Sequence, residues 1–114
     1  MKRSIAVLLA VLAAPFAFAA PSATKPFSVQ LAADDMHEEC MHLAAGEKRH
    51  WSWRSDAPVD FNIHYHEGDD VRFPVKRDGM RGDGGTFTAQ VAQDYCWMWA
   101  SRGKAVKLQG RIAK

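Results

Sequence analysis

The residues of this chain best suited to chemistry are its histidines and cysteines. His64 and His66 lie two positions apart in an alternating run, so a strand would project both imidazoles from one face, about 7 Å apart along the chain. His42 and Glu67 are further candidate ligands, and such sets suit copper or zinc. Alternatively, both histidines are solvated positions on the outer face of an antiparallel strand. No cofactor is the first expectation, and a copper or zinc site is the alternative.

The N-terminus predicts the compartment. A basic pair, Lys2 and Arg3, precedes an apolar stretch over Ile5 to Ala14, and Ala17-Phe18-Ala19 offers small residues where a signal peptidase cleaves. We expect a signal peptide over residues 1–19 and a protein of the periplasm or a secreted protein. The apolar stretch is shorter than the roughly 20 residues of a membrane span. No second such run follows, so we expect no membrane span in the mature chain.

Two cysteines, Cys40 and Cys96, occur in this chain. In an exported protein an even number of cysteines favours a disulfide, here closing a loop of more than fifty residues. The chain-entropy model assigns such a bond about 4 kcal/mol. A redox thiol and a metal thiolate are the alternatives, although no Cys-x-x-Cys pair accompanies either residue.

Charge argues against a nucleic-acid partner. The chain has 15 Lys plus Arg and 13 Asp plus Glu, and cleavage removes Lys2 and Arg3, which leaves 15 − 2 = 13 of each sign. Nucleic-acid binding favours a basic surplus, and the mature chain has none overall. About 95 residues then form a single domain. We expect residues 20–26 to be a flexible lead and residues 27–114 to be the folded domain.

Short alternating runs separated by turn residues predict an all-β protein. Tyr95, Trp97 and Trp99 share one face of a strand, with Cys96 and Met98 on the other. Pro74 marks its strand as an edge or irregular strand. The expected strands are 27–31, 38–43 (which could also be helical), 50–54, 59–66, 71–75, 86–91, 94–100 and 105–112, with a turn at 55–58 and a loop at 77–85. Seven or eight such strands predict an antiparallel, jelly-roll-like β-sandwich.

The tryptophans allow two interpretations. Trp51 and Trp53 alternate on one expected strand, and Trp97 and Trp99 alternate on another. A pair facing solvent could form a binding platform on which sugars stack. Aromatic residues dominate burial in small domains, so we expect all four to lie in the core.

The arrangement of these residues resembles a known family. An early cysteine, a turn at Gly46, the run Ala57-Pro58-Val59-Asp60-Phe61-Asn62-Ile63 and the late run Tyr95-Cys96-Trp97-Met98-Trp99 look like the GOLD domain of the p24/emp24 cargo receptors. The resemblance covers roughly residues 37–112. It implies a β-sandwich that binds proteins or lipids without catalysis. Cys96 stands two positions before the late cysteine of the family pattern, and Ser101 stands where an asparagine is usual.

No complete catalytic constellation is present in the sequence. The adjacent acids Asp69 and Asp70 would diverge on a strand, and the serines lack a nucleophile-elbow context. We therefore expect an exported, non-catalytic binding or interaction module, and not an enzyme. Its partner would be a protein, a glycan or a lipid. A periplasmic metal-binding protein is the alternative.

Overall fold

The computed structural model describes residues 24–114, which form six antiparallel strands. The expected signal peptide lies outside the described residues. None of the residues that the structure describes forms a helix long and apolar enough to cross a membrane. The strands are β1 (Thr24–Leu31), β2 (Met36–Leu43), β3 (Lys48–Glu67), β4 (Asp70–Thr88), β5 (Gln93–Ser101) and β6 (Val106–Ala113).

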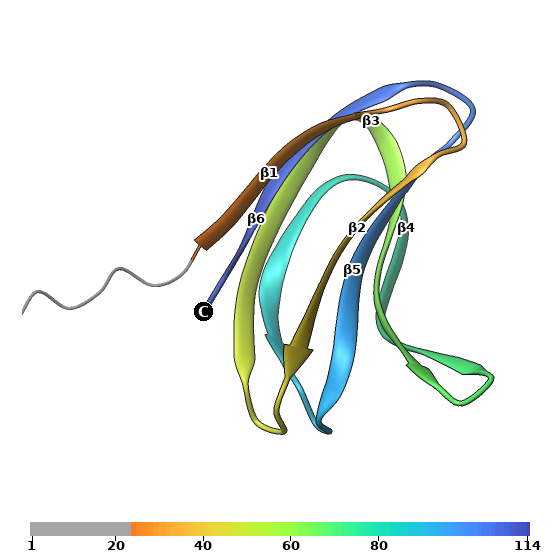
Figure 1. Ribbon diagram of the computed structural model, residues 1–114. Coiled ribbons are helices and arrows are strands. Elements are labelled where there is room, and N and C mark those ends of the chain that lie inside the picture. Colours follow the sequence, from red (N-terminus) through yellow and green to blue (C-terminus); the bar gives the residue numbers. More distant parts are fainter. Residues whose placement is uncertain (1–23) are drawn as a thin grey trace, which may run out of the picture.

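The strands form one sheet that is folded over into two layers, because β3 changes its partner along its length (Figure 1). The first half of β3 pairs with β6 as far as Ser55↔Leu108, and β1 pairs with the other side of β6. The second half of β3 pairs with β5 from Val59↔Ser101, and β2 pairs with the other side of β5. β4 follows β3 through both layers and forms an edge of each.

This topology confirms the antiparallel all-β class and corrects the number of strands. The expected turn over residues 55–58 is the part of β3 that crosses between the layers, and the expected loop over residues 77–85 belongs to β4. The register of the β3–β4 pair shifts between Arg54 and Val59, so the strands bend there without ending. The glycines of this segment resemble those of a loop, which is why the sequence did not predict this part of β4. At Gly85 the strand needs a glycine, because a Cβ atom there would lie 3.2 Å from the Trp51 ring. The first strand also begins at Thr24, inside the expected flexible lead.

The expected inner faces are confirmed. Tyr95, Trp97 and Trp99 of β5 are buried, and Phe61 and Ile63 of β3 face them from the neighbouring strand. The core thus lies between the two layers.

Pro74 lies in an edge strand beside a register shift, which is where a proline is tolerated in a sheet.

All four tryptophans belong to this core. Each exposes 6% of its surface or less. The possible stacking platform of Trp51, Trp53, Trp97 and Trp99 is therefore wrong, because these side chains fill the space between the layers.

One glycine leaves room for the side chains of the strands that flank it on both sides in the first layer. A Cβ atom on Gly110 of β6 would lie 2.6 Å from the Phe27 ring, 2.7 Å from the Ser52 carbonyl oxygen and 2.8 Å from Trp53 Cβ. Two of these three neighbours are backbone or near-backbone atoms, which cannot move without distorting the sheet.

We expect Gly110→Ala to lower the free energy of unfolding by about 1–3 kcal/mol, as overpacking typically does. Urea unfolding followed by tryptophan fluorescence measures this change. The neighbouring exposed residue provides the control, since Gln109→Ala should change stability by less than about 0.5 kcal/mol. Equal stabilities of the two variants would contradict the close packing at Gly110.

A disulfide joins Cys40 of β2 to Cys96 of β5. The two residues lie directly opposite each other in the ladder, at a sequence separation of 56. The bond therefore connects an edge strand to a central strand of the same layer.

We expect the double variant Cys40→Ala/Cys96→Ala to lose about 4 kcal/mol of stability, because the unfolded chain regains the entropy of a long loop. Urea unfolding of the variant and of the oxidised protein compares the two states. A reducing agent should destabilise the oxidised protein and leave the variant unchanged. A loss below about 1 kcal/mol would contradict a stabilising role of the bond.

Candidate binding site

A candidate site lies at the end of the molecule where the β3–β4 hairpin diverges from the other strands (Figure 1). A cavity of about 500 Å³ opens there between this hairpin and the β4–β5 loop. Its walls are largely aromatic and its rim is polar. The lining residues are Tyr65, Arg72, Phe73, Pro74, Phe87, Thr88, Gln90, Val91 and Tyr95.

The aromatic walls are held by contacts with the core. The Tyr95 ring meets the Tyr65 and Phe87 rings edge-on, with centroids 5.3 and 5.0 Å away. The Tyr95 hydroxyl also donates a hydrogen bond of 2.7 Å to the carbonyl oxygen of Val91. The position of the β4–β5 loop is thereby fixed relative to the hairpin.

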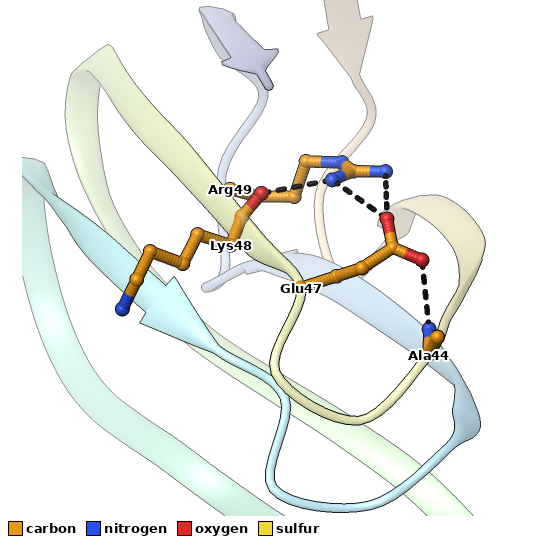
Figure 2. Close-up of polar contacts among 4 residues, drawn as sticks. All are labelled: Ala44, Glu47, Lys48 and Arg49. Carbon is orange, nitrogen blue, oxygen red and sulfur yellow. Dashed lines mark hydrogen bonds and ion pairs between the residues drawn. The ribbon is translucent and has the colours of Figure 1, made fainter.

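The adjoining β2–β3 turn, whose internal contacts are drawn in Figure 2, supports the same loop. The Glu47 carboxylate accepts a hydrogen bond of 3.0 Å from the Ala44 N–H and faces the Arg49 guanidinium at 3.4 Å. The Ala44 N–H and the Arg49 charge lower the pKa of Glu47. The turn in turn holds the β4–β5 loop, since the Gly46 N–H donates to the Ala89 carbonyl and the Ala89 N–H donates to the Glu47 carbonyl.

Two apolar side chains at this site remain exposed. Phe73 exposes 45% of its surface and Val91 exposes 46%. None of the described lining residues is a carboxylate, a histidine or a cysteine, so the cavity suits an apolar group held by contact and by a few hydrogen bonds. No sequence pattern points to this site, because Phe73 and Val91 have the character of ordinary strand residues.

The His-x-His pair lies on the outer face of the second layer, beside Phe73. Contrary to the interpretation of solvated positions, His64 exposes 4% of its surface and Asn62 exposes 6%, whereas His66 is exposed. The His64 Nδ1 donates a hydrogen bond of 2.8 Å to the Asn62 amide oxygen. The Phe73 ring lies 5.9 Å from the His64 ring.

Burial lowers the pKa of His64, and the nearby His66 lowers it further, while Glu38 opposes both effects. The Glu38 carboxylate lies 3.7 Å from His64 Nε2. The neutral ring is therefore the form that the fold favours.

The four candidate metal ligands do not gather in one place. The His64 and His66 rings lie 5.4 Å apart, but the His42 ring is hydrogen-bonded to Asp94 on the β2–β5 pair, and Glu67 lies at the exposed end of β3. Across residues 24–114, one group of three closely spaced potential ligands occurs, formed by Glu38, Cys40 and Cys96. Both of its sulfur atoms belong to the disulfide, which makes them poor ligands.

Comparison with known proteins shows the fold. No protein-family model and no curated protein matches the chain. A periplasmic lysozyme inhibitor of g-type lysozyme, PliG from Aeromonas hydrophila, is similar in structure, with a TM-score of 0.59 and 12% identity over 84% of this chain and 90% of PliG. A mitogen derived from Yersinia pseudotuberculosis is also similar, with a TM-score of 0.55 and 9% identity over 82% of this chain and 86% of the mitogen. At such identities the likeness extends to the all-β fold.

We expect the free energy of unfolding to fall as the pH is lowered through about 6.5. His64 then takes up a proton in the unfolded chain, whereas burial keeps its ring neutral in the folded protein. The stability that neutral His64 contributes is fully present above the ordinary pKa of histidine. It is lost as the pH falls toward the lower pKa that His64 has in the folded protein. In His64→Gln this part of the pH dependence should disappear.

Urea unfolding between pH 8 and pH 5 measures this effect. His50→Gln is the matched control, since its ring is exposed on the same strand and does not contribute to the pKa shift of His64, so the variant should retain the pH dependence of the parent protein. Parallel pH curves for the parent and His64→Gln would contradict the role of the buried ring.

Proposed function

We propose that this protein is an exported, non-catalytic binding module whose partner is another protein. The observation that carries the proposal is the aromatic cavity between the β3–β4 hairpin and the β4–β5 loop, with Phe73 and Val91 exposed at its mouth. Protein interfaces concentrate their binding energy in a few apolar and aromatic anchors that are surrounded by a polar rim. Arg72, Thr88 and Gln90 provide such a rim here.

The distribution of ionisable groups supports a non-catalytic role. Acid–base catalysis needs groups with shifted pKa values to meet at one reacting atom. Here the shifted carboxylates and histidine are far apart in the fold, with Glu47 on the β2–β3 turn, Asp60 beside Arg102 near the β5–β6 loop, and His64 on the outer face of the second layer. Each of them has a structural partner of its own.

Export to the periplasm or the medium is part of the proposal. The Cys40–Cys96 disulfide supports an oxidising compartment, and the structurally similar PliG is described as periplasmic. A binding role is also what the resemblance to the GOLD domain implies. No family model supports membership of that family, so the GOLD assignment stays a hypothesis.

A g-type lysozyme is the partner we propose to test first, because PliG inhibits such an enzyme and shares the fold. We expect the immobilised protein to bind a g-type lysozyme in surface plasmon resonance. Phe73→Ser and Val91→Ser should each raise the Kd at least tenfold, because each removes an apolar anchor at the mouth of the cavity. Lysis of a peptidoglycan suspension by the lysozyme should slow in parallel.

Met36→Ser provides a matched control. Met36 is an equally apolar and even more exposed residue, at 58%, but it lies on β2 at the other edge of the second layer. This variant should bind like the parent protein. A g-type lysozyme that does not bind would exclude this partner, and equal losses in all three variants would exclude the cavity as the binding surface.

A further inference from the structure

The outer face of the first layer carries a second, chemically different surface. Three adjoining hollows of about 730, 510 and 240 Å³ lie over β1, β6 and the first half of β3. The first two share Ser28, Arg54 and Gln109, and the second and third share Ser52 and Arg111. They therefore form one continuous depression, which we call the β6 groove.

Three cations line the β6 groove. Arg54 lies opposite Gln109, so it is diagonal to both Lys107 and Arg111, which flank Gln109 on the same face of β6. Diagonal neighbours of this kind have Cβ atoms roughly 7–8 Å apart. The three positive charges thus follow a zigzag along the groove.

These cations have no side-chain partners among residues 24–114, because no ion pair or side-chain hydrogen bond involves Arg54, Lys107 or Arg111. Four arginines elsewhere each face a carboxylate: Arg49, Arg72, Arg77 and Arg102. One acid, Asp56, also lines the groove, and its carboxylate accepts a hydrogen bond of 2.8 Å from the backbone N–H of Lys107. Three positive charges against one negative charge leave the groove basic.

The exposed side chains between the cations are small and polar: Ser28, Gln30, Ser52 and Gln109. The neighbouring positions on β4, opposite Ser52 and Arg54, are Gly84 and Gly82, which add no side chain to the face. The exposed large apolar residues of the described chain (Met36, Val71, Phe73, Met80 and Val91) do not line the groove.

We propose that the β6 groove binds an anionic polysaccharide. This function goes beyond the protein binding proposed for the cavity between the β3–β4 hairpin and the β4–β5 loop. Cations at regular spacing match repeated carboxylate or sulfate groups, and the amides and hydroxyls between them can hydrogen-bond to sugar hydroxyls. A protein partner or a lipid surface would favour apolar anchors, and single-stranded nucleic acid would favour exposed aromatic rings for stacking. The groove presents neither.

Isothermal titration of the secreted protein with polygalacturonate and dextran sulfate tests this proposal, with uncharged dextran as the ligand control. We expect binding to both anionic polymers and none to dextran. Arg54→Gln/Arg111→Gln should weaken binding at least tenfold and should reduce the slope of log K against log salt by roughly one for each contact removed.

Lys76→Gln/Lys104→Gln is the matched control, because it removes the same charge from two exposed lysines that do not line the groove and should change the affinity less than twofold. Equal losses in the two double variants would show binding by overall charge and would overturn the proposal. Stronger binding to a thymidine 20-mer or to phosphatidylglycerol vesicles than to either anionic polysaccharide would also overturn it.

Discussion

The contact between the two layers is the interaction on which the rest of this structure depends. Phe61 lies at its centre, with ring centroids 4.8 Å from Trp51, 5.5 Å from Trp53 and 5.5 Å from Trp99. Three buried indole N–H groups, those of Trp53, Trp97 and Trp99, have no hydrogen-bond acceptor among the described residues, at a cost of about 1–3 kcal/mol each. Burying 150–250 Å² per aromatic ring contributes roughly 4–6 kcal/mol, so packing outweighs that cost.

This core explains why the two ends of the molecule differ. β3 and β4 cross between the layers at one end, where Asp60 accepts hydrogen bonds from Arg102 and from the Gly79 N–H. The Arg102 guanidinium lowers the pKa of Asp60, which keeps this contact ionic. At the opposite end the layers are joined only by turns, so the β3–β4 hairpin can diverge and leave aromatic side chains accessible. The proposed protein-binding cavity is a consequence of how the sheet folds over.

Particular residues show how far the sequence could be interpreted. Alternation correctly separated Phe61 and Ile63 from Asn62 and His64, because a strand must place successive side chains on opposite faces. It could not show that His64 is buried, since that depends on Glu38, Phe73 and the disulfide, which come from other parts of the chain. The glycines of the expected loop were misleading for a similar reason, because Gly85 is needed where β4 approaches Trp51.

The all-β class, the inner faces of the strands and the two cysteines available for a bond follow from local periodicity and composition. Where the proposed binding surfaces lie depends on the tertiary structure. Phe73 and Val91 come together at one cavity, and Arg54, Lys107 and Arg111 come together at one groove, through pairing between distant strands. No local pattern encodes such a meeting, since register and layer packing depend on the whole chain.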